Sequence, residues 1–340
     1  MKAFTLVKYG RTPDSFELRD IEKPKPSEMQ VLIQVEAFGL NFADVMARQG
    51  LYQDAPPLPA VLGYEVVGRI ESVGDKVKGL SVGQRVVALT RFGAYAEFAV
   101  TDYRAVVVIP DDMPAGIAAS IATQYSTAYY CAYEMAPLFE GQHVLIQAGA
   151  GGVGIALIQM AKNKGCTVYA TAGSEEKINF MKNLGVDYAI NYNQEDFEKK
   201  IKSIRGKTGL DVIFDSLGGK AVQKGMRLLG SGGRMICYGV ASRAGKSKGI
   251  LNDLPLAFGF GIFSPIPLLL KSQGIVGVNM LRIADDRPDT LNRCMDAVAK
   301  EIQAGKLSPH IGGEFKSDQL IEAHDYLGNR KSMGKIIVHW

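Results

Sequence analysis

Short apolar stretches separated by glycine-containing turns fill roughly the first third of the chain. Closely spaced stretches of this kind predict short strands, and hence a compact, mostly β domain that extends to about residue 110. The clearest expected strands are 31–35, 66–70, 85–89, 95–100 and 105–109.

Near residue 118 the pattern changes, and longer helical stretches begin to alternate with short apolar strands. Helices are expected at 118–136, 153–164, 175–184, 195–204 and 220–228, and strands at 144–148, 167–172, 188–191, 212–215, 233–238 and 275–279. Such alternation is typical of a parallel sheet covered by helices on both faces. A doubly wound α/β domain is therefore predicted.

The last part of the chain is expected to return to the first domain and make it discontinuous. Two helices, 289–304 and 317–327, and a strand at 335–338 follow the α/β region. The predicted division is a β-rich domain of residues 1–122 and 283–340, and an α/β domain of residues 123–282.

Composition narrows the classes of function. The 340 residues are 47% hydrophobic, which is enough for two domains with sizeable cores. The formal net charge is only +4 and no basic cluster occurs, so nucleic-acid binding is not expected. The four cysteines are isolated, with no CxxC pair, and no secretory signal is recognised. These features favour a protein of the reducing cytoplasm that acts on small molecules.

A glycine-rich motif, Gly149-Ala150-Gly151-Gly152-Val153-Gly154, lies between an expected strand and an expected helix. This GxGxxG context is specific for dinucleotide binding. Gly149 permits a tight turn, Gly151 lets a pyrophosphate approach the backbone, and Gly154 lets helix and strand pack closely. The N–H groups and the positive end of the helix dipole would then face the phosphates.

The tip of the next strand indicates which dinucleotide is bound. NAD-specific sites carry an acid there for the ribose hydroxyls, whereas here the tip is Ala172-Gly173-Ser174, with no carboxylate before Glu175. A 2′-phosphate would meet the Ser174 hydroxyl and, about one helical turn later, the Lys177 ammonium group. NADP(H) is therefore expected, although Lys177 also fits a solvated helix lysine.

Five motifs mark the chain as similar to a known family: GLNFAD at 39–44, GYE at 63–65, AGAGGVG at 148–154, ATAGS at 170–174 and DSLGG at 215–219. They resemble the medium-chain dehydrogenase/reductase superfamily, specifically its zinc-independent quinone oxidoreductase branch. The stretches 41–52 and 308–311 resemble most the VAT-1-like group of vesicle proteins within that branch. The resemblance covers essentially the whole chain.

This resemblance implies a GroES-like β-rich domain built from both chain ends and a Rossmann-type domain, with the cofactor in the cleft between them. It also implies a homodimer formed through the edge strand at 275–279. Tyr192 is expected near the 2′-phosphate, although a partly exposed aromatic side chain there equally fits a lid over the sheet edge. The other residues expected along the cofactor are Asn41 and Thr127 near the nicotinamide, and Leu217, Gly239 and Asn279.

Zinc is not expected. Zinc-dependent members of the superfamily use a cysteine and the histidine of a GHE motif as ligands, and the corresponding places here hold Asn41, or its immediate neighbours, and Tyr64. Neither residue offers the thiolate or imidazole from which zinc sites are built. The four histidines of the chain show no ligand spacing.

Without a Lewis acid, hydride transfer suits acceptors that are already electrophilic, such as quinones and α,β-unsaturated carbonyls. Asn41 is expected to donate a hydrogen bond to the acceptor oxygen, with Tyr52 or Tyr64 as a second donor or a wall of the site. Each tyrosine equally fits ordinary packing. Asp44 is expected to fix the start of its helix rather than to act as a base.

The apolar segment 254–270 is too short and too rich in proline to span a bilayer. It fits a buried hinge and dimer region, the lining of a cavity for a lipophilic quinone, or a weak peripheral membrane patch beside Arg243, Lys246 and Lys248. Two alternatives to a quinone reductase follow. One is an enal or enoyl reductase of the same superfamily, and the other is a peripheral lipid-binding protein that retains NADPH as a ligand.

Overall fold

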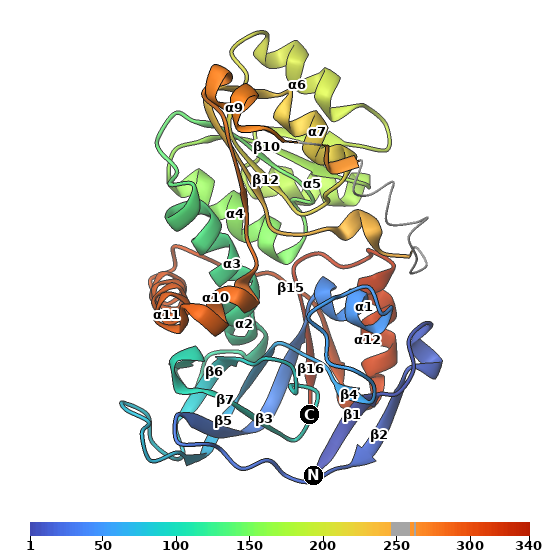
Figure 1. The fold of residues 1–340 in the computed structure, drawn as a ribbon, viewed down its shortest axis with the longest axis vertical. Helices are drawn as coiled ribbons and strands as arrows, with labels where there is room; N and C mark the ends of the chain where they lie inside the picture. The colour runs from blue at the N-terminus through green and yellow to red at the C-terminus, as the bar shows by residue number, and fades with distance from the viewer. Residues whose placement is uncertain (246–258, 262) are drawn as a thin grey trace. The chain divides into compact units, whose positions relative to one another are not determined.

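The computed structural model describes residues 1–245, 259–261 and 263–340. The chain divides into two compact units. The terminal unit comprises Met1–Ser126 and Met280–Trp340, and the central unit comprises Thr127–Asn279. Both ends of the chain lie in the terminal unit (Figure 1). The first terminal segment ends at residue 126 and the central unit at residue 279. The sequence predicted these two boundaries at residues 122 and 282.

A seven-stranded sheet forms most of the terminal unit (Figure 1). Its order is β15-β16-β3-β5-β6-β8, and β7 also pairs with β3. The strands are β3 (Gln30–Leu40), β5 (Glu65–Val73), β6 (Arg85–Leu89), β7 (Phe98–Asp102), β8 (Val106–Val108), β15 (Ile311–Lys316) and β16 (Lys335–His339). Because β16 runs antiparallel to β3, with Ile336 opposite Leu40, the last residues of the chain complete a sheet that the first residues begin.

The strands nearest the N-terminus of this unit differ from the sequence prediction in two ways. A separate three-stranded sheet of β1 (Lys2–Leu6), β2 (Phe16–Asp20) and β4 (Ala60–Val61) was not expected. In β2 only the first residue, Phe16, is buried. The strand predicted at 95–100 begins only at Phe98. Tyr95 instead lies in a buried turn, and its backbone N–H donates to the Leu62 carbonyl.

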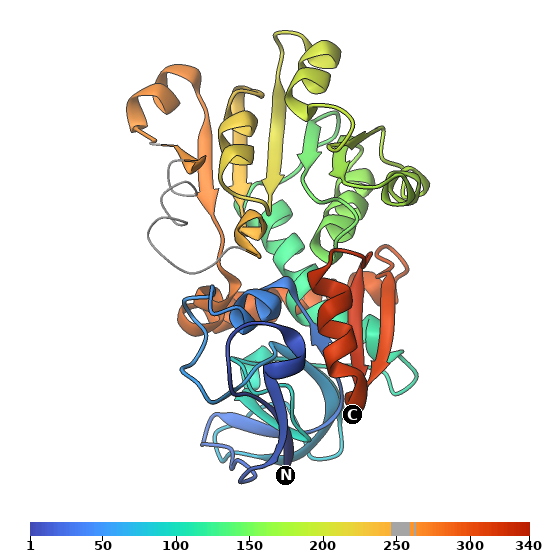
Figure 2. The same ribbon diagram turned by 90° about the vertical axis from the view of Figure 1, so that its right-hand side faces the viewer.

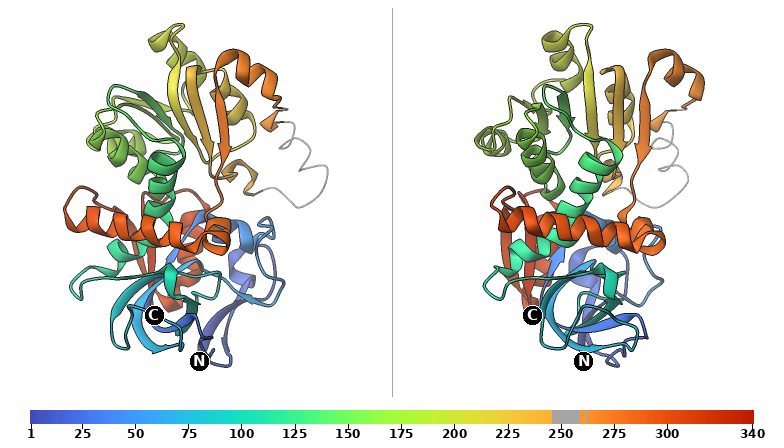
Figure 3. Two further views of the ribbon diagram at one scale, coloured as in Figure 1. Left: turned by 60° about the vertical axis from the view of Figure 1, so that its left-hand side comes forward. Right: turned by 90° about the vertical axis from the view of Figure 1, so that its left-hand side faces the viewer.

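The helices of the terminal unit cover parts of these sheets. They are α1 (Phe42–Arg48), α2 (Ala115–Ser120), α10 (Met280–Asp286), α11 (Pro288–Gln303) and α12 (Leu320–Gly328). The longest, α11, buries Leu291, Met295 and Val298, which recur at the spacing of one helical face. The helix packs on β8 and on the helical segment Ile121–Tyr125. It is the long orange helix in Figure 3.

The helix predicted at 118–136 begins earlier and is irregular. It starts with α2 at Ala115, and two π-helical stretches, Ile121–Tyr125 and Tyr130–Met135, flank α3 (Ser126–Tyr129). The Ser126 hydroxyl and N–H both reach the carbonyl of Ile121, five residues earlier, as a π-turn requires. The junction of the two units falls inside this segment.

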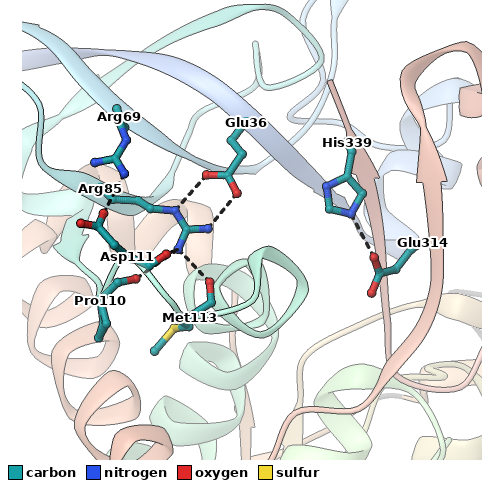
Figure 4. A network of polar contacts seen from close by, with 8 residues as sticks. All are labelled: Glu36, Arg69, Arg85, Pro110, Asp111, Met113, Glu314 and His339. Atoms are coloured by element: carbon teal, nitrogen blue, oxygen red, sulfur yellow. Dashed lines mark hydrogen bonds and ion pairs between the residues drawn. The ribbon is translucent and has the colours of Figure 1, made fainter.

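One guanidinium group joins the sheet of the terminal unit to the loop before α2 (Figure 4). Arg85, almost fully buried on β6, donates to both carboxylate oxygens of Glu36 on β3, at 2.9 and 2.8 Å. Its third nitrogen donates to the Met113 carbonyl at 2.7 Å, and more weakly to those of Pro110 and Asp111. These bonds fix the direction in which the chain leaves the sheet.

The central unit contains a six-stranded, all-parallel sheet in the order β11-β10-β9-β12-β13-β14. The strands are β9 (His143–Ile146), β10 (Thr167–Ala172), β11 (Tyr188–Asn191), β12 (Leu210–Asp215), β13 (Leu229–Cys237) and β14 (Gly274–Gly277). The predicted doubly wound parallel sheet is confirmed. The order proceeds outward from β9 in one direction and from β12 in the other, so the carboxyl ends of these two strands border a topological switch point.

Helices connect these strands. They are α4 (Gly152–Asn163), α5 (Glu175–Asn183), α6 (Phe197–Arg205), α7 (Lys220–Met226) and α9 (Pro265–Lys271). Because parallel connections are right-handed, the crossovers on the two sides of the switch point lie on opposite faces of the sheet. In Figure 2, α9 and the strand β14 that follows it lie at one edge of this sheet.

The described part of the apolar segment 254–270 leaves large side chains in solvent. In α9, the exposed fractions of Ile266, Leu269 and Leu270 are 66%, 79% and 80%. The strand that follows, β14, has an unpaired edge within the described sheet. Lys246, Lys248 and residues 254–258 lie outside the described residues. None of the helices that the structure describes is both long and apolar enough to cross a membrane.

Candidate functional site

The GxGxxG sequence forms the turn that leads from β9 into α4. Ala148 adopts a left-handed conformation (φ +53°), which is uncommon for a residue with a side chain. Two hydrogen bonds to Thr171 on β10 stabilise the turn. The Thr171 hydroxyl accepts from the Ala148 N–H at 3.3 Å, and the Thr171 carbonyl accepts from the Gly149 N–H at 2.9 Å. Gly151 is the N-cap, and no side chain of the described chain caps α4. The first helical N–H groups, which have no acceptor within the helix, belong to Gly152, Val153 and Gly154.

The three motif glycines have different surroundings. A Cβ on Gly149 would lie 2.6 Å from the Met181 sulfur, and one on Gly154 would lie 2.5 Å from the Ala148 carbonyl oxygen. Close packing therefore requires glycine at both positions. A Cβ on Gly151 would meet only one atom, 3.3 Å away. Packing within the chain gives no strong reason for glycine there, so Gly151 is available for close approach of a ligand to the backbone.

The tip of β10 brings together the residues expected to select the cofactor. Ser174 is the N-cap of α5, and its hydroxyl oxygen accepts from the Lys177 N–H at 3.4 Å. The hydroxyl hydrogen of Ser174 therefore stays available to an acceptor. The Tyr192 hydroxyl lies against Gly173, since a Cβ there would be 2.5 Å from it. Tyr192 is 41% exposed and covers the tip of β10.

The remaining expected cofactor residues of the central unit lie in two loops and at its ends. Gly239, after β13, lies against Ser216, after β12, and a Cβ on Gly239 would be 2.8 Å from the Ser216 carbonyl oxygen. The Leu217 carbonyl accepts from the Ser242 N–H at 3.0 Å, so these two loops are joined. The other two residues are the first and last of the unit, Thr127 and Asn279.

A buried polar row under the glycine turn was not anticipated from the sequence. Thr171, Gln147 and Asp215 follow one another across neighbouring strands, and the Thr171 hydroxyl donates to Gln147 Oε1 at 2.6 Å. Gln147 Nε2 and Asp215 Oδ2 are buried without a hydrogen-bond partner among the described residues. Burial raises the pKa of Asp215 to about 6, against the lowering effect of the Gly218 N–H.

Asn41 begins α1 inside the terminal unit and is only 7% exposed. Its Nδ2 donates to Glu65 at 2.7 Å, and its Oδ1 accepts from Lys335 at 3.3 Å. Its backbone N–H donates to Asp44 at 2.8 Å, and the second oxygen of Asp44 accepts from the Gly63 N–H. Asp44 therefore fixes the start of α1, as predicted. One hydrogen of the Asn41 amide is used by Glu65, and donation of the other to a substrate stays a prediction.

Lys335, for which the sequence predicts no role, forms a fully buried ion pair with Glu65 beside Asn41. The exposed fraction of both side chains is 0%. Gly39 on β3 makes room for them, because a Cβ there would overlap both charged groups. Glu65 Oε2 has no partner among the described residues. A lysine at the first position of an apolar strand is ordinarily exposed at the surface. The local sequence therefore did not predict this pair.

Tyr52 and Tyr64 lie next to one another, with ring centroids 6.1 Å apart in an edge-to-face arrangement. Tyr64 is 3% exposed, and its hydroxyl has no hydrogen-bond partner within the described chain. Burial, followed by the charge of Asp54, raises the pKa of Tyr52 to about 12, and burial raises the pKa of Tyr64 well above its ordinary value. Both phenols therefore keep their protons at neutral pH and are able to donate hydrogen bonds.

A neutral histidine lies in the same unit. His324 on α12 is fully buried, and its Nε2 is 3.2 Å from the hydroxyl of Tyr95. Burial, assisted by the charge of Arg48, lowers the pKa of His324 to about 3. The ring also packs on Phe16 with centroids 4.8 Å apart. His324 is therefore part of the core of the terminal unit.

The side chains around Asn41 do not fit a zinc ion. Two of the groups nearest to it are the Lys335 ammonium and the Glu65 carboxylate that the ammonium neutralises. Tyr64 contributes a protonated phenol, whereas zinc ligands are thiolates, imidazoles and free carboxylates. Across residues 1–245, 259–261 and 263–340, no group of three or more His, Cys, Asp or Glu side chains is arranged to hold a metal.

Comparison with known proteins gives the same architecture. The family "Alcohol dehydrogenase GroES-like domain" matches residues 27–111, and the family "Zinc-binding dehydrogenase" matches residues 152–299. The chain is 33% identical to the synaptic vesicle membrane protein VAT-1 homolog of Danio rerio, over 99% of this chain and 69% of the relative. It is 31% identical to the quinone oxidoreductase of Rattus norvegicus, over 99% and 97%.

Solved structures are also similar over nearly their whole length. A mycobacterial protein in complex with NADPH has a TM-score of 0.86 at 28% identity, with 100% of both chains covered. The CurK enoyl reductase has a TM-score of 0.84 at 27% identity, with 99% of this chain and 98% of that chain covered.

The GroES-like terminal unit and the Rossmann-type central unit define a medium-chain dehydrogenase/reductase. Within that superfamily of oxidoreductases, the chain belongs to the branch that contains the quinone oxidoreductases and the VAT-1-like proteins. The resemblance read from its motifs is confirmed.

Proposed function

We propose that this oxidoreductase uses NADPH to reduce a quinone or a related α,β-unsaturated carbonyl compound, and that it does so without zinc. The observation that carries the proposal is the glycine turn, in which uncapped helical N–H groups lie beside the uncrowded Gly151. When bound, NADPH supplies the hydride. Every other contribution is assigned to side chains and backbone groups of this chain.

The glycine turn would hold the pyrophosphate. The N–H groups of Gly152, Val153 and Gly154 are donors without an acceptor in α4, and the helix dipole places partial positive charge at the same end. Gly149 and Gly154 keep this turn close to β10 and α4. The loops that carry Leu217 and Gly239, with Thr127 and Asn279, would line the rest of the cofactor, as members of the family imply.

The tip of β10 would select NADPH over NADH. Ser174 retains a hydroxyl hydrogen for a phosphate oxygen, Lys177 supplies a positive charge, and the Tyr192 hydroxyl lies against Gly173. No carboxylate precedes Glu175 at this tip. We expect Lys177→Met to weaken NADPH binding about tenfold and to leave NADH binding within about twofold, because only the phosphate loses a charged partner. Lys182→Met, on an exposed part of the same helix, is the control.

Polar groups of the terminal unit would bind the carbonyl oxygen of the acceptor. The Tyr64 hydroxyl is buried without a hydrogen-bond partner among the described residues, so an oxygen within its reach would satisfy it and gain a hydrogen bond. Tyr52 and the second hydrogen of the Asn41 amide are the other candidate donors. Because both phenols stay protonated, they stabilise developing negative charge on the oxygen rather than remove a proton. One proton, in addition to the hydride, completes the reduction.

Zinc-free reduction rests on the donor groups that occupy the site. An ammonium group beside Asn41 and a protonated phenol at Tyr64 repel or fail to coordinate a cation. Acceptors that are electrophilic without a Lewis acid therefore suit this chemistry best. Quinones, enals and enoyl thioesters share this property, and an enal or enoyl reductase is the nearest alternative.

The apolar edge of the central unit favours contact with a partner surface. Ile266, Leu269 and Leu270 are exposed beside the edge of β14, which pairs with no other strand of the described part of the chain. We assign this surface to a second copy of the chain, in a homodimer. A lipid surface is the other candidate occupant, and would make the protein a peripheral membrane module. Leu269→Ser with Leu270→Ser is expected to yield monomers in light scattering; loss of liposome cosedimentation with an unchanged mass would favour the lipid surface.

The decisive experiment combines binding and turnover. NADPH fluorescence is titrated with the purified protein, and NADPH oxidation is then followed with quinones, enals and enoyl thioesters, with and without a chelator. Tight NADPH binding and chelator-resistant quinone reduction are expected. Absence of NADPH binding, or loss of activity with the chelator, would refute the proposal. Faster turnover of enals or enoyl thioesters would assign the alternative.

A further inference from the structure

An acidic residue lies immediately after the strand tip that is proposed to bind a 2′-phosphate. Glu175 is the first residue of α5 and follows the N-cap Ser174. A carboxylate there is favourable for the helix, since it lies at the positive end of the dipole. It is unfavourable for a dianionic phosphate at the same tip, because like charges repel. The chain therefore carries a charge that helps α5 and opposes NADPH.

Side chains at the end of β11 and just after it bind the Glu175 carboxylate and the backbone next to it. Asn191, the last residue of β11, is only 7% exposed, and its Nδ2 donates to Glu175 Oε1 at 2.7 Å. The Asn191 Oδ1 accepts from the Asn193 N–H at 3.1 Å, which fixes the orientation of the amide with its donor group toward the carboxylate. The Asn193 side chain in turn donates to the Gly173 carbonyl at 2.7 Å.

These contacts all come from the β11 side of the tip of β10. Asn191 pairs with Ala172 across β10 and β11, so its side chain is anchored by the sheet and not by a mobile loop. The carboxylate of Glu175 is consequently tied to the β11 side of the tip, while its backbone begins α5. Tyr192, between the two asparagines, places its hydroxyl against Gly173.

We propose that Asn191 is a specificity-determining residue for the cofactor. Its amide binds the Glu175 carboxylate, partly compensates the negative charge and prevents the side chain from turning toward the 2′-phosphate or toward the ribose hydroxyls of NADH. The inference rests on the proposed function, since it concerns how the same nucleotide site distinguishes NADPH from NADH. Without Asn191, the untethered carboxylate repels the phosphate of NADPH and offers an acceptor to the ribose of NADH.

The test is a double-mutant cycle with dissociation constants for both nucleotides. Asn191→Ala is expected to weaken NADPH binding about two- to fivefold, the range for one solvent-exposed charge interaction, and to leave NADH binding equal or tighter. Glu175→Gln in the Asn191→Ala background is expected to restore NADPH binding to within about twofold of the wild type. Glu175→Gln alone is expected to stay near the wild type.

Glu176 provides a matched control, because it is an exposed acid on the same first turn of α5. Glu176→Gln is not expected to rescue Asn191→Ala. Equal losses for NADPH and NADH, or equal rescue by Glu175→Gln and Glu176→Gln, would overturn the role of Asn191 and indicate a general structural effect.

A second variant covers the case in which Asn191→Ala does not fold. Asn191→Leu keeps the size of the side chain, removes the amide donor and adds no charge, so it is expected to weaken NADPH binding relative to NADH and to regain NADPH binding with Glu175→Gln. A wild-type protein that binds neither nucleotide would refute the proposed function itself. A wild type that prefers NADPH, with variants that keep this preference unchanged, would refute only the present inference.

Discussion

The two candidate regions of this protein treat their polar groups in opposite ways. Around Asn41, an amide, two carboxylates and an ammonium group are buried and bind mainly one another. At the glycine turn of the central unit, the helical N–H groups are uncapped and Gly151 is uncrowded. The first region is nearly complete without a ligand, whereas the second has donors that await an anion.

The two regions therefore have different roles in the protein. Groups that are already paired at a buried site chiefly determine shape, since breaking such a pair leaves a charge without compensation. Donors that lack partners at a helix N-terminus determine binding, because an incoming anion satisfies them at little cost to the protein. Changes at the Asn41 cluster should therefore act mainly on stability, and changes at the turn mainly on affinity.

The largest expected effect comes from removing one charge of the buried pair. Lys335→Met leaves Glu65 buried without its partner, and should lower the free energy of unfolding by about 3–5 kcal/mol. Chemical unfolding followed by fluorescence measures the loss. Lys331→Met, at an exposed position four residues earlier, should change it by less than about 0.5 kcal/mol. A loss below about 1 kcal/mol for Lys335→Met would show that this pair is not structural.

Acid should weaken the interior of the terminal unit through His324. The pKa of His324 is lowered to about 3 in the folded state from an ordinary 6.5, so the unfolded chain binds the extra proton between these values. Stability from the neutral ring is therefore present above pH 6.5 and is lost as the pH falls toward 3. At pH 5 the loss amounts to roughly 2 kcal/mol relative to pH 7. His324→Gln should lack this component, and identical pH profiles for variant and wild type would contradict it.

A pair of glycine substitutions separates affinity from stability within the turn. Gly151→Ala should leave the unfolding free energy within about 0.5 kcal/mol, because the new methyl group meets only one atom at 3.3 Å. It should weaken NADPH binding by about tenfold or more, since the methyl group lies where the pyrophosphate would approach. Gly154→Ala should instead destabilise the protein by about 1–3 kcal/mol, because its methyl group overlaps the backbone. Similar effects of both on stability would remove the distinction.

A small change in stability, with a clear effect on turnover, is expected at Tyr64. Tyr64→Phe removes a buried hydroxyl that has no partner within the described chain, so stability should stay equal or rise slightly, by less than about 1 kcal/mol. The value of kcat/KM for quinones should fall about tenfold if the hydroxyl binds the acceptor oxygen. An unchanged kcat/KM would show that the Tyr64 hydroxyl does not bind the acceptor and that the side chain serves only packing.

The contrast between the regions also explains what the sequence revealed. The glycine turn, the strand tip at Ser174 and the alternation of strands and helices along the central unit follow from residues adjacent in sequence, so local patterns predicted them. The pair of Glu65 and Lys335 joins residues 270 positions apart, and no local pattern encodes that contact. The strand at β2 was missed because it buries a single residue, and the start of the strand at 95–100 was wrong because Tyr95 packs in the core as part of a turn. Tertiary contacts decide such positions, and propensity does not.

The connection of β16 to β3 has a consequence for biosynthesis. Residues 37–40 of β3 gain the partners that β16 supplies only when residues 336–339 have been translated, roughly 300 residues later. At about 5–20 residues per second, this strand emerges from the ribosome about 15–60 s before its neighbour. The Rossmann-type unit, encoded without interruption, is able to fold in that interval, while the edge of β3 that later pairs with β16 stays open in the nascent GroES-like unit.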